Sequence, residues 1–368
     1  MPLALVITEL DVGGAEKALV SLATALDRRL WNPLVIALGP EAPMAAPLRK
    51  AGVAVACLDV SLKYPARAFA QLVSTLRAHR PTLIQSFLFH ANIAVRLAAP
   101  FSGAPWVIGG LRVAEREKRW HLRIDRLTAP LANGSVCVSE GVRRFSREVG
   151  WPDAKLTVIP NAVEIALFDQ SEAIPRDRIG VPPASFLALY VGRLNVQKGL
   201  HTLLDAAERV VAQRPDWHLA LAGDGPERPW LDERLAANPI IASHVHPLGS
   251  RSDIPALLKT ADMLVLPSLW EGMPNAILEA MAARRASVAT AVEGTEDLIV
   301  QGETGWLVPP ADPSSLAAAL VDAASDPGRL GRYGEAAHSR AERLYSPAQN
   351  VRAYENLWAK ILGFELPK

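Results

Sequence analysis

Two cations stand in one short, glycine-bounded segment in the second half of the chain. The segment V-G-R-L-N-V-Q-K-G (191–199) places Arg193 and Lys198 directly after an apolar run that is typical of a strand, and Gly199 opens a helical pattern. A pyrophosphate requires positive charge, and cations near the N-terminus of a helix supply it. We therefore predict that Arg193 and Lys198 bind a diphosphate, with two solvated surface cations as the alternative.

Two carboxylates bracket a second segment, P-S-L-W-E-G-M-P-N-A-I-L-E-A-M-A (267–282). Glu271 is expected in a loop and Glu279 in the helix behind it, about 12 Å apart along the axis if all residues between them were helical. Because paired glycosidase carboxyl groups lie about 5–9.5 Å apart, this pair is badly placed for hydrolysis. We expect the carboxylates to hold separate hydroxyl-bearing parts of one extended ligand. The residues after Glu271 offer backbone groups at the helix start, namely Gly272, Met273, Pro274 and Asn275.

A glycine pair follows the first apolar run of the chain. Gly13 and Gly14 stand in D-V-G-G-A-E-K-A-L, just before a helical pattern. Glycines let the backbone approach a ligand closely, and the start of a helix presents free N–H groups. The pair is not a G-x-G-x-x-G fingerprint, so a dinucleotide is weakly supported. A plain turn explains the pair as well as a ligand contact does.

Short apolar runs alternate with helix-length segments along the chain. The runs lie at 3–8, 33–38, 53–58, 82–87, 105–110, 134–139 and 155–160 in the first half, and at 186–192, 217–223, 244–249, 263–267, 286–290 and 305–309 in the second. Strand runs separated in this way indicate βαβ units and a parallel sheet. The sequence therefore predicts an α/β protein of two Rossmann-like, doubly wound domains, with ligands expected in the cleft that the strand ends face.

The alternation stops at 165–184, a stretch with three prolines and mixed charges that is typical of a connection. Two helices without strands, roughly 313–343 and 347–364, follow the last apolar run. We therefore expect an N-terminal domain over 1–165, a C-terminal domain over 166–345 and a final helical segment over 346–368.

Composition excludes several classes of protein. Of the 368 residues, 50% are hydrophobic and 21% charged, which fits a globular protein with a sizeable core. No apolar run reaches the ~18 residues of a membrane span, and the N-terminus lacks the basic start of a signal peptide, so a cytoplasmic location is expected. The two cysteines, Cys57 and Cys137, give no disulfide framework and no metal cluster. Since no D-x-D pair is present either, we expect neither a metal nor a cofactor.

Charge divides unevenly between the two halves. Residues 1–165 carry 20 Lys and Arg against 13 Asp and Glu, whereas residues 166–368 carry 19 against 25. In the basic half, the segment A-E-R-E-K-R-W-H-L-R-I-D-R-L (114–127) also carries Trp120 and Leu122. A basic amphipathic helix can lie on an anionic membrane, which would make this segment a peripheral membrane contact of the first domain. A solvated surface helix is the alternative, and no nucleic-acid partner is expected.

The loops and their order resemble the family 4 glycosyltransferases of the GT-B fold. The likeness runs from residue 3 to about 345, and the last helix resembles the family's crossover back to the first domain. The family's motifs correspond to Gly13-Gly14, P-N-A-V (160–163), Gly192-Arg193 with Lys198-Gly199, and Glu271 and Glu279 with seven residues between them. The resemblance implies retaining transfer from a nucleotide-diphospho-sugar, with uridine or guanosine, to a glycan or lipid-linked acceptor, without a bound metal.

The resemblance implies roles for the residues of the second half. Arg193 and Lys198 would neutralise the departing diphosphate. Glu279 would hold the ribose hydroxyls, and Glu271 with the backbone from Gly272 to Asn275 would hold the sugar. Such preorganised charges stabilise the negative charge that develops as the diphosphate leaves.

Further residues complete the implied site. The Gly14 amide would approach a phosphate, and the loop Gly249-Ser250-Arg251 would lie near the base. Many relatives have a histidine near the end of the fourth strand that reaches the donor sugar, where this chain has Phe87 and, three residues on, His90. His90 could reach the cleft from the next helix, although a local hydrogen-bonding role is more common. Arg112, after the fifth strand, could help to place the acceptor.

Two other functions stay open on the sequence. One is a nucleotide-sugar epimerase of the same fold, and the other is a non-catalytic nucleotide-sugar-binding protein, which the missing histidine leaves possible. His244 and His246 alternate on an expected strand and are interpreted as structural. Synthesis of a polysaccharide or a cell-envelope glycan is the expected setting.

Overall fold

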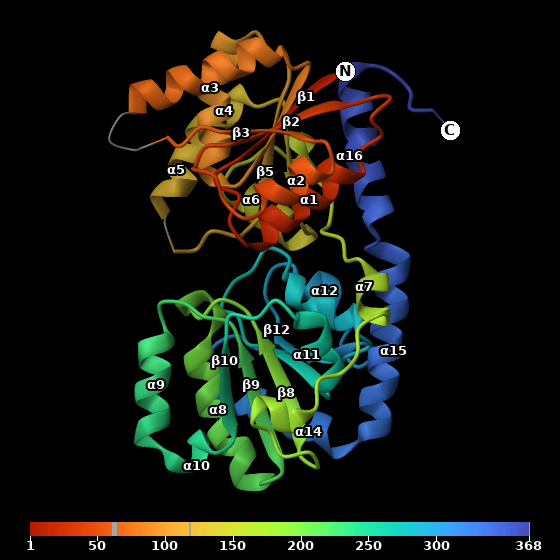
Figure 1. Ribbon diagram of the computed structural model, residues 1–368. Helices are drawn as coiled ribbons and strands as arrows, with labels where there is room; N and C mark the ends of the chain where they lie inside the picture. Colours follow the sequence, from red (N-terminus) through yellow and green to blue (C-terminus); the bar gives the residue numbers. More distant parts are fainter. Residues whose placement is uncertain (61–64, 118, 368) are drawn as a thin grey trace. The chain divides into compact units, whose positions relative to one another are not determined.

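The computed structural model describes residues 1–60, 65–117 and 119–367, and the chain forms two compact units (Figure 1). The first unit consists of Met1–Ala162 together with Pro347–Lys368, and the second of Val163–Ser346. The last segment of the chain thus belongs to the first unit.

The first unit is built on a seven-stranded parallel sheet. Its strand order is β3-β2-β1-β4-β5-β6-β7. The strands are β1 (Pro2–Ile7), β2 (Asn32–Ala37), β3 (Ala54–Cys57), β4 (Leu83–Phe87), β5 (Val107–Leu111), β6 (Gly134–Cys137) and β7 (Leu156–Val158). The order reverses between β1 and β4, and ligands of such sheets bind beyond the carboxyl ends of the strands at this point.

The two faces of β1 belong to two separate cores. Leu3, Leu5 and Ile7 pack with α1 (Gly14–Ala25), α2 (Ala45–Lys50) and α16 (Pro347–Leu362). Ala4 and Val6 pack instead with α3 (Pro65–His79) and α4 (Phe89–Ser102). Successive side chains of a strand point to opposite faces, so a strand buried on both faces is apolar throughout. This explains why the strand runs were visible in the sequence.

The helix α16 completes the core of the first unit. Its Trp358 is fully buried and meets Trp31 edge to face, with ring centroids 5.3 Å apart. The Trp358 indole N–H donates to Gln85 Oε1 of β4 at 3.3 Å. Figure 1 shows α16 running beside α1.

The remaining helices of the first unit follow β5 and β6. They are α5 (Arg119–Thr128), η1 (Ala129–Leu131), α6 (Glu140–Glu148) and η2 (Asp153–Lys155). The Ser139 hydroxyl accepts from the Val142 N–H at 3.0 Å and so caps α6. The amphipathic segment expected over 114–127 is helical only from Arg119. Lys118, which contributes to its basic charge, lies outside the described residues.

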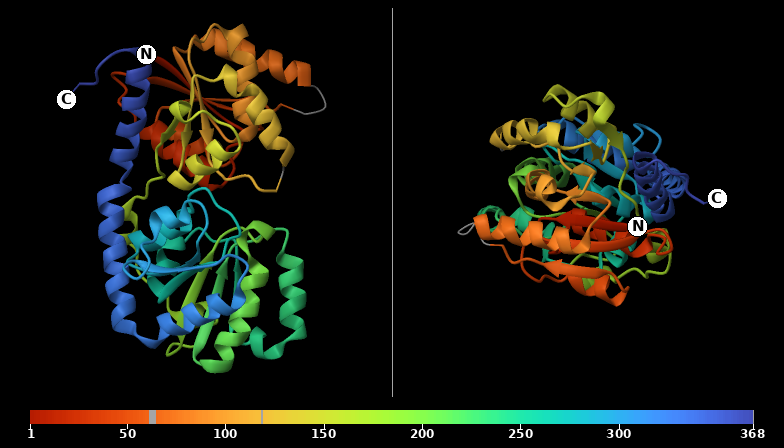
Figure 2. Two further views of the ribbon diagram at one scale, coloured as in Figure 1. Left: turned by 180° about the vertical axis from the view of Figure 1, so that it is seen from behind. Right: turned by 90° about the horizontal axis from the view of Figure 1, so that it is seen from above.

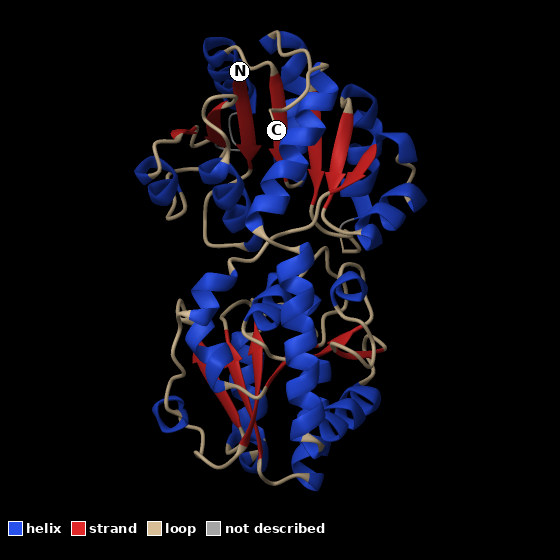
Figure 3. Ribbon diagram, turned by 90° about the vertical axis from the view of Figure 1, so that its right-hand side faces the viewer, coloured by secondary structure: helices blue, strands red, loops and turns tan. Residues whose placement is uncertain are grey.

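The second unit contains a six-stranded parallel sheet with the order β10-β9-β8-β11-β12-β13. The strands are β8 (Phe186–Val191), β9 (Trp217–Ala222), β10 (Val245–Gly249), β11 (Met263–Leu266), β12 (Ser287–Thr290) and β13 (Gly305–Val308). Figure 3 shows the strands of each sheet side by side between helices. The prediction of two parallel-sheet α/β domains is confirmed.

The helices of the second unit connect these strands. They are α7 (Ile165–Asp169), η3 (Arg176–Ile179), η4 (Val196–Lys198), α8 (Leu200–Gln213), α9 (Arg228–Ala237), α10 (Pro239–Ala242), α11 (Ile254–Thr260), α12 (Asn275–Ala282), α13 (Thr295–Leu298), α14 (Pro313–Ser325) and α15 (Pro327–Leu344). In Figure 2, α14 lies beside α8 on one face of the sheet. No helix of the described residues is long and apolar enough to cross a membrane.

The single helix expected over 313–343 is wrong, because the structure has two helices there. The chain breaks at Asp326, whose carboxylate accepts from the Arg329 N–H at 2.9 Å and caps α15. Pro327 then occupies the first helical position, where its missing N–H costs nothing. An Asp-Pro pair is a helix start signal, and the apolar spacing alone concealed it.

Candidate functional site

The predicted diphosphate loop connects β8 to α8. Residues 192–195 leave the strand, η4 makes one turn, and Gly199 precedes α8 in a left-handed conformation with φ +66°. A Cβ atom on Gly199 would lie 2.0 Å from the carbonyl oxygen of Pro267. Only glycine therefore lets this loop pack against the chain that leaves β11.

An ion pair joins the loop after β8 (192–199) to the loop after β11 (267–274), which we call the carboxylate loop. The Lys198 ammonium pairs with Glu271 Oε1, and the Ser268 hydroxyl donates to the same oxygen at 2.7 Å. Glu271 is only 5% exposed. Two further bonds connect the loops, since the Leu269 N–H donates to the Gln197 carbonyl at 2.7 Å and the Gln197 amide donates to the Trp270 carbonyl at 2.8 Å. The two segments predicted separately thus form one structure.

Tyr190 supports this pair from the strand below. Its buried hydroxyl donates to the Arg193 carbonyl at 3.1 Å. Burial and, secondarily, the nearby Glu271 carboxylate raise the pKa of Tyr190 far above its ordinary value, so the hydroxyl stays protonated. The bond fixes the backbone from which the Arg193 side chain projects.

Arg193 and Lys198 differ in exposure and in ion pairing. The Arg193 side chain is exposed, and its guanidinium has no hydrogen-bond or ion-pair partner in the described part of the chain. Lys198 is instead half-buried and paired with Glu271. Arg193 is therefore the cation that an incoming anion meets without displacing another group.

The helix α12 begins directly after the carboxylate loop. Only Asn275–Ala282 is helical, so the 12 Å separation expected for a continuous helix between Glu271 and Glu279 does not apply. Gly272, Met273 and Pro274 are buried, whereas Asn275 and Glu279 are partly exposed at the surface of the unit. The loop is held by Gly294, where φ is +74° and an added Cβ would lie 1.8 Å from the Gly272 carbonyl oxygen.

The loop after β10 is connected to the same sheet edge. The Gly223 N–H donates to the Gly249 carbonyl at 2.8 Å, and a Cβ on Gly223 would lie 1.9 Å from the Gly192 carbonyl oxygen. Arg251 is bound to Asp253, with Nε 2.8 Å from Oδ1, and this pairing holds the pKa of the Asp253 carboxyl below its ordinary value. Arg251 therefore differs from Arg193, because a ligand would have to share it with a carboxylate.

The Gly13-Gly14 turn of the first unit already faces an anionic side chain. The helix α1 begins at Gly14, and a Cβ on Gly13 would lie 2.2 Å from Glu16 Oε2. Glu16 is 7% exposed, and burial raises the pKa of its carboxyl. A phosphate near Gly14 would compete with this carboxylate for the same helix start.

His90 and Arg112 line a cavity of about 290 Å³ in the first unit. The cavity lies beyond the carboxyl ends of β1, β4 and β5, where the sequence placed both residues. Arg112 donates to Asn161 Oδ1 at 2.6 Å, and burial lowers the pKa of its guanidinium. His90 contacts the rings of Phe89 and His121, with centroids 5.2 and 5.7 Å away.

Models of two protein families match successive parts of the chain. Residues 12–167 match Glycosyltransferase Family 4, and residues 185–326 match Glycosyl transferases group 1. The chain belongs to the family 4 glycosyltransferases. The resemblance stated from the loops is thereby confirmed, and the protein is an enzyme of the glycosyltransferase class.

Several characterised proteins are similar to this glycosyltransferase. The UDP-Gal:alpha-D-GlcNAc-diphosphoundecaprenol alpha-1,3-galactosyltransferase of Escherichia coli is 28% identical over 287 residues, which cover 73% of each chain. The phosphatidyl-myo-inositol mannosyltransferase of Mycolicibacterium smegmatis is 31% identical over 61% of this chain and 57% of its own length. Among solved structures, HepE of Anabaena superposes with a TM-score of 0.85 at 22% identity, covering 98% of this chain and all of HepE. That structure shows the GT-B fold.

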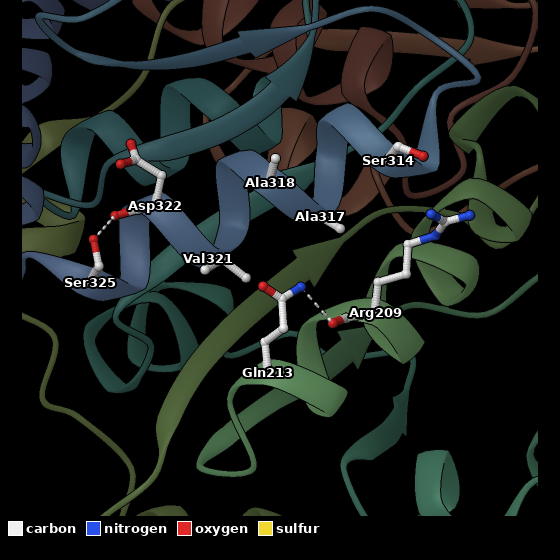
Figure 4. Close-up of a pocket in the computed structure, with 8 residues that line it drawn as sticks. All are labelled: Arg209, Gln213, Ser314, Ala317, Ala318, Val321, Asp322 and Ser325. Atoms are coloured by element: carbon white, nitrogen blue, oxygen red, sulfur yellow. Dashed lines mark hydrogen bonds between the residues drawn. The ribbon is translucent and has the colours of Figure 1, made fainter.

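The second hollow of this glycosyltransferase lies away from the strand ends. It has a volume of about 590 Å³ and is lined by α14 and the C-terminal half of α8 (Figure 4). Its polar groups bond locally, since the Gln213 amide donates to the Arg209 carbonyl at 3.1 Å and the Ser325 hydroxyl donates to the Asp322 carbonyl at 2.6 Å. None of the predicted site residues lines it.

Sequence reasoning missed Ser268 and Tyr190 at the site, which were signalled only by their position at strand ends. It also missed His218, the second residue of β9, which contacts the two histidines of the neighbouring segment. His218 Nδ1 lies 3.0 Å from His246 Nε2, and its ring stacks on His244 with centroids 4.8 Å apart. Burial lowers the pKa of His246 to about 4, which keeps this ring neutral.

Proposed function

We propose that this glycosyltransferase is a retaining enzyme whose donor is a nucleotide-diphospho-sugar bound by the second unit. The observation that carries the proposal is the Lys198–Glu271 ion pair, together with Arg193, which lies on the same loop as Lys198 and whose guanidinium has no partner among the described residues. It sets two cations and a desolvated carboxylate on loops that leave neighbouring strands. Cations suit a diphosphate, and a carboxylate accepts hydrogen bonds from sugar hydroxyls.

The proposed reaction follows from these charges. The bond between the anomeric carbon and the diphosphate oxygen breaks, the acceptor oxygen bonds to the same face of that carbon, and the acceptor proton passes to the leaving diphosphate. Arg193 and Lys198 stabilise the charge on the leaving group, while Glu271 holds the sugar. Glu279 is proposed to hold the ribose, and the Gly249–Arg251 loop to lie beside the base.

The names of the similar proteins support a uridine donor. The Escherichia coli relative uses UDP-Gal, and HepE has been solved with UDP and with UDP-glucose. UDP-sugars are therefore the first donors to test, with GDP-sugars as the alternative. Both relatives named by activity act on lipid-borne acceptors, which supports a glycan or lipid-linked acceptor in cell-envelope synthesis.

The surface of α5 supports access to such an acceptor at an anionic membrane. Trp120 is 53% and Leu127 78% exposed. Residues 1–165 carry seven more basic than acidic side chains. Each Lys or Arg near an anionic surface contributes about 1 kcal/mol, so the proposed adhesion is weak, reversible and screened by salt.

A thermal-shift screen of UDP, GDP and their sugars tests the donor, because a ligand at 100 times its Kd stabilises the folded state by about 2.7 kcal/mol. NMR spectroscopy of the product then identifies the anomer. Stabilisation by none of the compounds would contradict the proposed donor, and an inverted anomer would contradict retention. Epimerised donor formed without any acceptor would favour the epimerase instead.

A further inference from the structure

The two oxygens of the Glu271 carboxylate have different surroundings. Oε1 is paired with the Lys198 ammonium and accepts from the Ser268 hydroxyl at 2.7 Å. Oε2 has no hydrogen-bond partner among the described residues, and it is not one of the enclosed polar atoms that lack a partner, so it is open to solvent. A ligand that donates a hydrogen bond therefore meets Oε2 without displacing a group of the protein.

Ser268 is held more firmly than the other partner of Oε1. It lies two residues after the end of β11 and three positions before Glu271, and it is fully buried. Its carbonyl accepts from the Thr290 hydroxyl at the end of β12, which ties its backbone to the neighbouring strand. Lys198 reaches Oε1 with a flexible four-carbon chain instead. Ser268 is therefore a fixed donor and Lys198 a movable one.

Binding of a diphosphate would affect these two bonds unequally. The Lys198 ammonium is a compact positive charge with three N–H donors, and in the proposed function it also neutralises the diphosphate. The diphosphate therefore competes with Glu271 for this charge. The Ser268 hydroxyl is uncharged and fully buried, so it stays on Oε1. It is the group that keeps the carboxylate in place when Lys198 turns to the diphosphate.

A purely structural role for the Ser268 hydroxyl is the alternative. A buried carboxylate needs hydrogen bonds whatever the site does, and the loss of one lowers the stability of the fold. Such a role would weaken the binding of every donor-site ligand to the same extent, or of none. A positioning role affects only ligands that bond to Oε2, so the ratio of two affinities distinguishes the two roles.

We propose that Ser268 is a positioning residue of the donor site, whose hydroxyl holds Oε1 of Glu271 so that Oε2 accepts from a hydroxyl of the donor sugar. This inference rests on the proposed function, in which Glu271 holds the sugar. A bare nucleoside diphosphate has hydroxyls only on its ribose, which Glu279 is proposed to hold. Its affinity should therefore not depend on Ser268, whereas the affinity of a sugar-bearing nucleotide should.

The neighbouring strand offers a matched control. Ser287 of β12 is 2% exposed, and its hydroxyl has no hydrogen-bond partner in the described part of the chain. Ser287→Ala and Ser268→Ala therefore remove the same atom from buried positions of one unit, but only Ser268→Ala removes a bond to Glu271. A second pair, Ser268→Thr and Ser268→Val, has side chains of similar size that differ in the hydroxyl group.

The test is calorimetry on the full chain with UDP, UDP-glucose and UDP-galactose, and with GDP and GDP-mannose in parallel. For a sugar nucleotide that wild type binds, Ser268→Ala should raise the Kd about ten-fold, the loss expected for one hydrogen bond to a charged group. The Kd of the matching bare nucleotide should stay within about two-fold, and Ser287→Ala should leave both constants within the same limit. The ratio of the two constants should be altered by Ser268→Val as by Ser268→Ala, and should be close to that of wild type in Ser268→Thr.

A double-mutant cycle with Glu271→Ala tests whether Ser268 acts through the carboxylate. In that background, Ser268→Ala should change the ratio of the two constants by less than about two-fold. Equal effects on the sugar nucleotide and the bare nucleotide, no effect on either, or an undiminished effect without Glu271 would overturn the proposal. A wild type that binds a bare nucleotide but no sugar nucleotide would overturn it as well, whereas one that binds neither overturns the donor proposal and this one with it.

Discussion

The Lys198 ammonium and the Glu271 carboxylate form an ion pair although 73 positions separate them in the sequence. The pair joins the loop after β8 to the loop after β11, and these two strands are neighbours at the centre of the second sheet. The Ser268 hydroxyl shares the same carboxylate oxygen. The charges proposed to bind the diphosphate and the sugar are thus held by one interaction.

Lys198→Ala should reduce both turnover and stability. Turnover should fall about 10²- to 10³-fold, as on loss of one preorganised group. The free energy of unfolding should fall by about 3 kcal/mol, because the buried Glu271 carboxylate is left unpaired. Turnover at saturating donor and urea denaturation measure the two effects. A variant with normal turnover would show that Lys198 has no part in catalysis.

Arg193→Ala should separate these two effects. Its guanidinium is exposed and unpaired within the described residues, so the free energy of unfolding should change by less than about 0.5 kcal/mol. Turnover should still fall about 10²- to 10³-fold. Arg209→Ala, in the hollow of Figure 4, is the control and should alter neither quantity. Equal turnover of the two alanine variants would count against a role for Arg193.

Gly294→Ala should distort the loop after β11, which contains Glu271 and Gly272, through a steric clash. An added Cβ would lie 1.8 Å from the Gly272 carbonyl oxygen, and φ is +74°. Gly302→Ala is the matched control, because φ is +77° but nothing lies within 4 Å of the added Cβ. The control should lose about 1 kcal/mol to backbone strain alone. Gly294→Ala should lose clearly more and bind donor more weakly. An equal loss of unfolding free energy in the two variants would mean that the loop moves to relieve the clash at no cost in stability.

The stacked histidines of β9 and β10 should make the second unit sensitive to acid. Burial first, and the His218 and His244 charges next, lower the pKa of His246 from an ordinary 6.5 to about 4. The unfolded chain therefore binds this proton more tightly, and stability must fall as pH falls from about 6.5 to about 4. Melting temperatures over this range measure the effect. His246→Gln should reduce the dependence of the melting temperature on pH. An unchanged dependence would show that other groups cause the loss of stability in acid.

Activity should survive chelation by EDTA. The described residues include no group of three or more His, Cys, Asp or Glu side chains that could hold a metal, and the sequence has no D-x-D pair. The charges of Arg193 and Lys198 are proposed to perform the role of a cation at the diphosphate. Loss of turnover on chelation that Mg²⁺ or Mn²⁺ restores would overturn this expectation.

The fold could be predicted because its strands are buried on both faces. Leu3 to Ile7 fill two cores in alternation, which leaves a continuous apolar run that the sequence displays. The break at Asp326 was missed because apolar spacing continues across it, although Asp326-Pro327 is itself a helix start signal. Capping residues and prolines therefore predict the ends of helices better than the spacing of apolar residues does.

The site could be predicted only in pieces. Arg193, Lys198 and Glu271 are recognisable by type and local spacing, but the ion pair between Lys198 and Glu271 depends on which strands are neighbours in the sheet. His121 was concealed differently. The segment 114–127 was interpreted as an amphipathic helix that lies on a membrane or is solvated at the surface. The burial of His121 depends instead on stacking with Phe89, which belongs to a distant part of the sequence.

Calorimetry of UDP binding tests the central claim most directly, with wild type and the Arg193→Ala/Lys198→Ala double variant measured side by side. The account predicts that wild type binds UDP and that the double variant binds at least 10²-fold more weakly, since hydrogen bonds to charged groups contribute about 1.5–3 kcal/mol each. GDP is the parallel ligand. Equal affinity of both proteins, or binding of neither nucleotide to wild type, would contradict a diphosphate site between these two loops.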